Sequence, residues 1–439
     1  MKIMKFGGTS VGSPQRLHAL VDIIYDGEAK IVVLSAMSGT TNDLVDISQA
    51  LYRKDNEQAE ALIDLLEEKY RLVIGRTFNE KATYDRSHEL IAVHFEFLRS
   101  FTRDLFTLNE ERAVLAQGEL LSTAIFHILL EERKINSVLL PALNFMRINE
   151  NGEPDIPFIT DSLTAELSKF TGENLFITQG YICRNAFGEI DNLQRGGSDY
   201  TATIIGAVLQ ASEIQIWTDI DGMHNNDPRI VNNTYPLAEL TFDEAAELAY
   251  FGAKILHPTC ILPAQNQNIP VRLLNALHPE APGTLISANK PAEGIKAVAA
   301  KDGITAIKIK SGRMLMAYGF LRAIFEIFER YHKPIDMITT SEVAVSITID
   351  NDAELESIVE ELRTFGTVEV NTGLSIVSIV GVFPANKPGY ANSIFNALKD
   401  IPVRMISYGG SEHNISVLVE TSLKKETLIA LNKGLFNLE

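Results

Sequence analysis

Four short stretches of the 439-residue sequence combine charged side chains with turns that can hold an anion. The first, KFGGTS, places Lys5 just before Gly7-Gly8 and the hydroxyls of Thr9 and Ser10. Backbone N–H groups at such glycines can approach an anion closely, and the start of a following helix attracts negative charge. The pattern matches neither common phosphate fingerprint, G-x-x-x-x-G-K-[ST] nor G-x-G-x-x-G. Taken alone, it fits a structural turn as well as a phosphate site.

The second stretch, QRGGSDYTA, places Arg195 before another Gly-Gly pair, with Ser198 and Asp199 opening an apolar helix. A helix N-cap accounts for Ser198 and Asp199, because these residue types accept from free N–H groups there. It does not account for Arg195 or the diglycine. An arginine fork beside a helix N-terminus binds a carboxylate or a phosphate well.

The other two stretches are WTDIDG with its later DPR, and FGAKILHP. In the first, a strand ends at Thr218-Asp219, and Asp221 and Arg229 come after it. Acidic turns are common for structural reasons, yet carboxylates at a strand end also suit ribose hydroxyls or Mg²⁺. In the second, Lys254 is predicted on a helix that ends at the His-Pro pair, where a lysine ordinarily interacts with the helix dipole.

The elements around these stretches predict an α/β fold. Over residues 1–290, β-branched strands alternate with amphipathic helices, which predicts a sandwich with a largely parallel sheet. Ligands of such sheets collect at the carboxyl ends of the strands. Residues 54–108 read as an inserted helical subdomain, and residues 111–132 as a pair of helices.

The C-terminal part has a different texture and repeats internally. Proline and glycine mark residues 282–302 as the domain boundary. Beyond this boundary the chain reads twice as strand, helix, strand, strand, helix, with a period of about 70 residues. Each copy opens its first helix after a glycine, Gly319 or Gly389. The repeat predicts a pair of small α+β modules.

Composition excludes several classes of protein. With 39 basic and 57 acidic residues, the net charge of −18 argues against a nucleic-acid or anionic-membrane partner. Cys183 and Cys260 form no CxxC pair, so neither a disulfide framework nor a zinc knuckle is indicated. The glycine turn at residue 7 comes too early for a signal peptide, and no apolar stretch approaches the ~20 residues of a membrane span. We expect a cytoplasmic protein.

Taken together and in order, these stretches resemble the aspartokinases of the amino acid kinase family. The resemblance spans KFGGTSVGS, SGTTNDL, AQGELLST, QRGGSDYTA, WTDIDG with DPR, FGAKILHP and the paired tail. ITTSEV after the first helix of the tail resembles the lysine-regulated, single-activity branch. The implied fold is a three-layer α/β sandwich with a largely parallel sheet, followed by two ferredoxin-like α+β ACT domains. The implied domains are residues 1–290, 303–376 and 377–439.

The resemblance implies ATP-dependent phosphorylation of the L-aspartate side chain to 4-phospho-L-aspartate, the first step towards lysine, threonine and methionine. ATP and Mg²⁺ are the implied cofactors, with no metal ligand from the protein. The implied catalytic residues are Lys5, Asp199 and Lys254, and the aspartate-binding residues are Thr41, Glu119, Tyr181, Arg195 and Ser198. The implied nucleotide-binding residues are Gly7, Gly8, Ser10, Thr218, Asp219, Asp221, Arg229 and Lys254.

For the tail, the resemblance implies an amino-acid effector, lysine, and a homodimer or dimer of dimers through the ACT domains. The implied effector pocket comprises Met314, Gly319, Phe320, Leu321, Asp336 and Ser341. Asp336 would bind an ammonium group, and the helix start after Gly319 would receive a carboxylate. Three positions depart from the family: Gln194 replaces a usual glycine, His224 a tyrosine and Ala317 a serine.

Three alternative interpretations stay open at this point. The same fold phosphorylates other acceptors, such as glutamate, a carbamate or a nucleotide, although Glu119 with Arg195 suits a zwitterionic amino acid. The chain can instead be a non-catalytic amino-acid sensor, which the presence of Lys5, Asp199, Asp219 and Lys254 disfavours. Finally, the tail can serve dimerisation alone, or respond to threonine rather than lysine.

Transfer to a carboxylate needs no general base, because that group is already ionised at pH 7.

Overall fold

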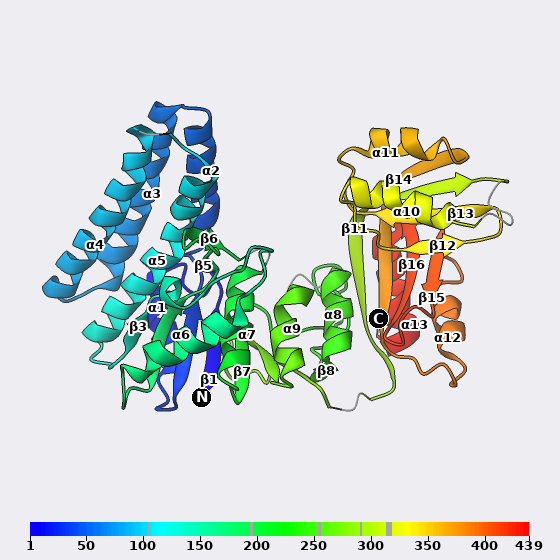
Figure 1. Ribbon diagram of the computed structural model, residues 1–439. Helices are drawn as coiled ribbons and strands as arrows, with labels where there is room; N and C mark the ends of the chain where they lie inside the picture. The colour runs from blue at the N-terminus through cyan, green and yellow to red at the C-terminus, as the bar shows by residue number, and fades with distance from the viewer. Residues whose placement is uncertain (104, 194–195, 253–255, 290–291, 313–317, 439) are drawn as a thin grey trace. The chain divides into compact units, whose positions relative to one another are not determined.

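The computed structural model describes residues 1–103, 105–193, 196–252, 256–289, 292–312 and 318–438. They form two compact units (Figure 1). Unit 1 comprises residues 1–223, 238–242 and 255–289, and unit 2 comprises residues 224–237, 243–254 and 290–439. We describe each unit by itself.

Unit 1 is built on an eight-stranded sheet with the order β3-β4-β2-β1-β7-β9-β10-β8. Its neighbouring strands run parallel except for β9 and β10, which confirms the predicted, largely parallel sheet. The strands are β1 (Lys2–Phe6), β2 (Lys30–Leu34), β3 (Val138–Leu140), β4 (Leu175–Gln179), β7 (Glu213–Thr218), β8 (Glu239–Thr241), β9 (Val271–Asn275) and β10 (Thr284–Ser287). A separate hairpin consists of β5 (Ile182–Arg184) and β6 (Ile190–Asn192).

The helices of unit 1 include the predicted insertion, in which α3 and α4 lie side by side (Figure 1). They are α1 (Pro14–Ile24), α2 (Thr40–Tyr52), α3 (Asn56–Thr77), α4 (Lys81–Ser100), α5 (Leu108–Glu132), α6 (Ile156–Ser168), α7 (Gly197–Val208) and α9 (Pro258–Asn266), with 3₁₀ turns at Phe101–Arg103 and Ala142–Asn144.

Two helix boundaries differ from the sequence-based expectation. Residues 111–132 lie in the single helix α5, not in two helices. Gly118 lies inside this helix. A Cβ at this position would lie 2.7 Å from Ala36, so the glycine allows close packing between the two segments. Pro258 begins α9 instead of ending the preceding helix, because a proline at the first helical position lacks only an N–H that would be unpaired anyway.

Helix α5 also corrects the expectation about apolar length. Among the described residues it is the one helix whose length and hydropathy meet the criterion for a membrane span. Within its most apolar window, however, 72% of the residues are buried inside the protein. Its apolar character is that of a core helix, which packs against the sheet on β2, β3 and β4.

Strand β1 places successive side chains on opposite faces of the sheet, as the pleat requires. Met4 and Phe6 enter a core cluster with residues of α1, α2 and α5. Lys5 lies on the other face, where α7 packs against β1. The alternation within β1 therefore delivers one charged side chain to the helix that begins at Gly197.

Unit 2 contains a six-stranded antiparallel sheet with the order β12-β13-β11-β14-β16-β15. Its strands are β11 (Gly294–Lys310), β12 (Ile338–Thr340), β13 (Ala344–Ile349), β14 (Thr367–Val382), β15 (Met405–Tyr408) and β16 (Asn414–Glu420). Its helices are α8 (Phe242–Tyr250), which belongs to this unit from Asp243 onward, α10 (Phe320–Arg330), α11 (Leu355–Leu362), α12 (Tyr390–Ala397) and α13 (Lys424–Phe436), with a 3₁₀ turn at Thr421–Leu423.

The predicted repeat is present, in the order strand, helix, strand, strand, helix, twice. One copy packs α10 and α11 over its strands, and the other packs α12 and α13. The two copies are joined along β11 and β14, which pair antiparallel from Gly294 opposite Val382 to Lys310 opposite Thr367. This pairing, with register shifts along it, is thus shared by both modules.

Candidate active site

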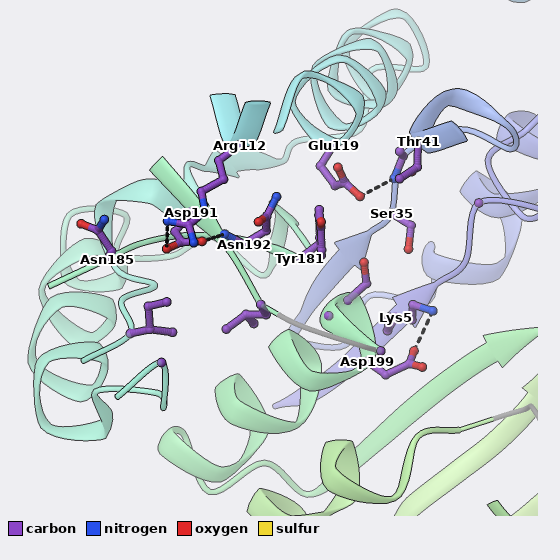
Figure 2. Close-up of a pocket in the computed structure, with 18 of the residues that line it drawn as sticks. Lys5, Ser35, Thr41, Arg112, Glu119, Tyr181, Asn185, Asp191, Asn192 and Asp199 are labelled. Atoms are coloured by element: carbon purple, nitrogen blue, oxygen red, sulfur yellow. Dashed lines mark hydrogen bonds and ion pairs between the residues drawn. The ribbon is translucent and has the colours of Figure 1, made fainter. Parts of the chain in front are cut away.

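A cavity of about 1020 Å³ in unit 1 collects residues from six separate segments, one of them the loop at residues 148–152 (Figure 2). It lies at the carboxyl ends of β1 and β2, beside α5, the β5–β6 hairpin and the first turn of α7. Its lining includes seven of the residues singled out in the sequence: Lys5, Gly8, Thr41, Glu119, Tyr181, Ser198 and Asp199. The structure therefore brings together residues that are almost two hundred positions apart in the chain.

Lys5 and Asp199 form an ion pair at the floor of this cavity, with 2.6 Å between Nζ and Oδ1 (Figure 2). The two side chains are only 12% and 13% exposed, so the pair is largely shielded from solvent. Asp199 lies in the first turn of α7, where a carboxylate is also favoured by the helix dipole. The pair fixes an ammonium group beside a helix N-terminus, which is a suitable place for an anion.

The two diglycine turns have a shared physical reason, which is close approach of backbone. A Cβ on Gly8 would lie 2.8 Å from the carbonyl oxygen of Ala36, and the Gly8 carbonyl accepts from the Ser38 N–H at 3.1 Å. A Cβ on Gly197 would lie 2.4 Å from the ring of Tyr181. The glycines let the end of β1 and the start of α7 pack closely against the cavity wall. Packing therefore explains the Gly196-Gly197 pair as well as anion binding does.

Glu119 is the most unusual group of the cavity, because it is a buried carboxylate that has no ion-pair partner among the described residues. It is 4% exposed, and its Oε1 accepts a hydrogen bond from the Ala36 N–H at 3.1 Å. Its Oε2 has no hydrogen-bond partner within the part of the chain that the structure describes. Burial raises the pKa of Glu119 to about 8, although the bond from Ala36 opposes the shift. Such a group is costly unless a cation reaches it.

Tyr181 opens the hairpin that forms the far wall of the cavity. Its φ is +68°, a conformation that few residues other than glycine adopt. Two hydrogen bonds hold it there: its N–H donates to Thr201 Oγ1 at 3.0 Å, and its carbonyl accepts from the Leu193 N–H at 2.7 Å. Burial, then the nearby carboxylates, raise the pKa of Tyr181 to about 12, so the hydroxyl stays protonated.

Sequence reasoning missed Arg112 and Asp191, which both line the cavity. Arg112 Nη1 lies 2.8 Å from Asp191 Oδ2 and so fastens the hairpin to α5 (Figure 2). Asp191 is well buried, with 8% of its side chain exposed. Neither residue belongs to a motif, and the only signal is that Arg112 lies two helical turns before Glu119, on one face of α5.

Among the described nucleotide-binding candidates, Gly8 lines this cavity and the others do not. Gly7, Ser10, Thr218, Asp219 and Asp221 belong to unit 1 but do not line the cavity described above. Asp219 accepts a hydrogen bond from the Thr218 hydroxyl at 3.2 Å, and Asp221 accepts one from the Asn275 amide at 2.5 Å. These contacts orient the two carboxylates at the carboxyl end of β7.

Two further positions belong to unit 2. Arg229 pairs with Asp227 at 2.8 Å, and its side chain is 72% exposed. His224, where the family commonly has tyrosine, has its Nδ1 2.9 Å from the Thr234 hydroxyl. The predicted residues Gln194, Arg195, Lys254, Met314 and Ala317 lie outside the described residues.

The described residues contain no group of three or more histidine, cysteine, aspartate or glutamate side chains arranged to hold a metal ion. Mg²⁺ in phosphoryl-transfer sites is often bound by one or two carboxylates together with the phosphates of the substrate. Asp219 and Asp221, as hard oxygen donors near the end of β7, fit that limited requirement.

The predicted effector residues are all in unit 2. Gly319 caps α10 with a φ of +83°, and Phe320 and Leu321 are the first residues of that helix. Ser341 is exposed in the loop after β12, where its N–H donates to the Ala344 carbonyl at 2.8 Å. The side chain of Asp336, in contrast, is 2% exposed and already has partners within the protein.

Comparison with known proteins agrees with this geometry. Residues 1–275 match the model of the amino acid kinase family, and residues 377–435 match that of an ACT domain. The chain is 34% identical to the lysine-sensitive aspartokinase 3 of Escherichia coli, over 99% of each chain.

Two solved structures of Escherichia coli aspartokinase III superimpose with a TM-score of 0.82 at 33% identity, over 99% of this chain and 99–100% of theirs. One contains lysine and aspartate in the T-state, and the other contains aspartate and ADP in the R-state. The fold is thus an amino acid kinase sandwich followed by ACT modules. With its full-length similarity and its matching fold, this chain belongs to the aspartokinases of the amino acid kinase family.

Proposed function

We propose that the protein transfers the γ-phosphoryl group of ATP to the side-chain carboxylate of L-aspartate, forming 4-phospho-L-aspartate and ADP, and is inhibited by lysine. The observation that carries the proposal is one cavity that joins the Lys5–Asp199 ion pair to Glu119, whose Oε2 has no hydrogen-bond partner among the described residues. A related aspartokinase has been crystallised with aspartate and ADP, which supports this choice of substrates.

The acceptor site follows from the charges of aspartate. The ammonium group of the substrate provides the cation that Glu119 lacks, and Arg195 binds its α-carboxylate. Thr41 and Ser198 offer hydroxyls along the same cavity, and Tyr181 forms an aromatic wall. The side-chain carboxylate is then directed towards Lys5.

In the chemical step, an oxygen of the substrate carboxylate forms a bond to the γ-phosphorus while the bond from this phosphorus to the β-phosphate oxygen breaks. No proton moves, because the attacking carboxylate is ionised at pH 7. The main difficulty is repulsion between anions, so positioned cations carry the catalysis. Lys5 faces the transferring phosphoryl group, Asp199 holds Lys5 in place, and Lys254 contributes a second positive charge.

The nucleotide is proposed to contact Gly7, Gly8, Ser10, Thr218, Asp219, Asp221, Arg229 and Lys254. When bound, Mg²⁺ neutralises charge on the phosphates. Asp219 and Asp221 are the residues best suited to hold it, because hydrogen bonds already orient their carboxylates at the end of β7.

For the whole chain, we propose a kinase domain over residues 1–290 and ACT domains over residues 303–376 and 377–439. The lysine pocket is proposed to comprise Met314, Gly319, Phe320, Leu321, Asp336 and Ser341. A homodimer or dimer of dimers through the ACT domains is the proposed assembly. The two free, buried cysteines are consistent with the proposed cytoplasmic location.

The direct test is an assay in which acyl phosphate is trapped as hydroxamate. With ATP, Mg²⁺ and aspartate, we expect product, and we expect millimolar lysine to reduce it. If product forms but lysine does not reduce it, the kinase activity is supported and lysine is not the effector. Threonine would then be tested as the effector. Failure to phosphorylate aspartate would contradict the proposed reaction, and other carboxylates or carbamates would then be assayed.

A second prediction concerns Arg195. Because its guanidinium is assigned to the α-carboxylate of aspartate, Arg195→Ala should raise KM for aspartate about 100-fold and leave KM for ATP within about threefold. Steady-state kinetics with each substrate varied in turn measures both. An equal loss for aspartate and ATP would contradict this assignment.

A further inference from the structure

A charged cluster in unit 2 surrounds Asp336, the buried residue proposed to bind the effector ammonium. Lys301 Nζ lies 2.7 Å from Asp336 Oδ1 and 2.9 Å from Asp350 Oδ2. The Tyr250 hydroxyl donates to the same Asp336 oxygen at 2.8 Å, and Lys301 Nζ lies 4.4 Å from the centre of the Tyr250 ring. These four side chains come from α8, β11 and the segments beside β12 and β13.

The cluster contains one cation and two carboxylates, and one buried oxygen is not satisfied. Asp336 Oδ2 has no hydrogen-bond partner in the described portion of the chain. Burial lowers the pKa of Lys301, but the two carboxylates more than compensate and raise it above the ordinary value, so Lys301 stays charged. The cluster therefore pairs two carboxylates with one cation, and the buried Asp336 Oδ2 can accept one further hydrogen bond.

We propose that Lys301 is an internal counter-charge that sets the concentration at which an amino-acid effector acts, and that Tyr250 connects the effector site to α8. The inference deepens the proposed function, since it rests on Asp336 as the effector-binding carboxylate. An ammonium that donates to Oδ2 shares Asp336 with the Lys301 ammonium. Like charges repel at this range, so Lys301 opposes effector binding while it stabilises the empty site.

The connection to α8 follows from the backbone next to the cluster. Tyr250 is the last residue of α8, and Gly252 has a φ of +125°. A Cβ on Gly252 would lie 2.1 Å from the carbonyl oxygen of Ala300, so the chain after α8 is pressed against β11 beside Lys301. Lys254, assigned to ATP, comes four positions after Tyr250. The hydroxyl of Tyr250 and the close approach of Gly252 therefore tie the end of α8 to Asp336 and to the strand that carries Lys301.

The first test replaces the internal cation. Lys301→Met should lower the lysine concentration for half-inhibition about tenfold, because the competing charge is gone, whereas Lys301→Arg should stay close to wild type. The matched control is Lys310→Met, which removes another ion-paired lysine from β11, paired with Glu369 at 2.7 Å. This control should leave inhibition unchanged. Unchanged or weaker inhibition of Lys301→Met would overturn the proposal.

The second test separates binding from coupling. Tyr250→Phe removes only the hydroxyl, so calorimetry on the full chain should show lysine binding within about threefold of wild type, while maximal inhibition falls by half or more. Tyr331→Phe is the control, because Tyr331 likewise donates to a carboxylate, Glu361, at 2.8 Å in the same unit. If lysine still inhibits the Tyr250→Phe variant fully, Tyr250 does not connect the effector site to α8.

The proposed function and the role of this cluster fail in different ways. Wild-type protein that makes no acyl phosphate from aspartate, or that makes it without any response to lysine, contradicts the proposed function. The role of this cluster alone is contradicted if lysine inhibits the wild-type protein and inhibits the Lys301→Met and Tyr250→Phe variants to the same extent.

Discussion

Replacing Lys5 by alanine should reduce kcat by about a thousandfold or more, while the protein still folds and still binds aspartate. Lys5 provides an ammonium group at the floor of the cavity, and its loss leaves the Asp199 carboxylate facing the same space without its cation. A negative charge there repels the phosphoryl oxygens in place of stabilising them. Hydroxamate trapping measures turnover, and calorimetry with aspartate measures binding.

Lys2→Ala is the control for Lys5→Ala. Lys2 lies on the same strand and is ion-paired to Glu28, but it is not part of the cavity lining. This variant should retain wild-type turnover. Comparable activity of the Lys5→Ala and wild-type proteins would show that the phosphoryl group is transferred without this ammonium, and would contradict the role assigned to Lys5.

The second large effect is expected from Glu119→Gln, which keeps the shape of the side chain and removes its negative charge. Because this carboxylate is assigned to the substrate ammonium, kcat/KM for aspartate should fall by two to three orders of magnitude, about 3–4 kcal/mol, with KM for ATP nearly unchanged. Steady-state kinetics at pH 8 measures the loss. A variant that retains normal aspartate use would place the ammonium elsewhere.

The same residue predicts a pH dependence of wild-type kinetics. With a pKa of about 8, Glu119 is mostly protonated at pH 7 and cannot pair with an ammonium group until it ionises. KM for aspartate should therefore decrease as the pH rises from 6.5 to about 8. This trend should be absent in Glu119→Gln.

Glu119 should also lower stability at high pH. The folded protein holds this proton more tightly than the unfolded chain, whose pKa is near 4.5, so the associated stabilisation is complete below that pH and is lost as the pH rises through about 8. The melting temperature of Glu119→Gln should consequently exceed that of the wild type at pH 9, and should differ little from it at pH 5. An equal difference at both values would contradict the assigned pKa.

Glu132→Gln, at the end of the same helix, should show the opposite trend. Burial alone would raise the pKa of Glu132, but hydrogen bonds from Thr83 and from the N–H groups of Asn79 and Glu80 lower it overall. Its stabilisation is present above the unfolded pKa and is lost as the pH falls through the lower folded value. The variant should therefore lose stability relative to wild type at neutral pH.

The sequence predicts local features of this protein well. Alternation places Lys5 on one face of β1, the run of apolar strands predicts a parallel sheet, and the tail shows its repeat because each copy has the same order of elements. The candidate cavity also follows from local rules, since strand ends before Gly-Gly turns gather at one edge of a parallel sheet.

Contacts between distant segments could not be predicted in this way. Arg112 pairs with Asp191 through the packing of α5 on a hairpin, and neither position has a neighbouring motif. The Tyr250 contact to Asp336 joins residues on two elements whose spacing in the chain carries no periodic signal. The close packing at Gly118 of α5 is against Ala36, which lies in another segment altogether. In each case the partner is chosen by tertiary packing.

The shared ladder of β11 and β14 limits how this protein can be divided. Because these two strands pair from Gly294 and Val382 to Lys310 and Thr367, with register shifts between these ends, a cut at the sequence boundary between the modules would divide β14 within its pairing to β11. A fragment that begins at residue 377 would keep part of β14 without the β11 strand beside it, and would expose an unpaired edge. Exchange of sensory specificity between such enzymes therefore has to move both modules as one cassette, with residues 294–438 inherited together.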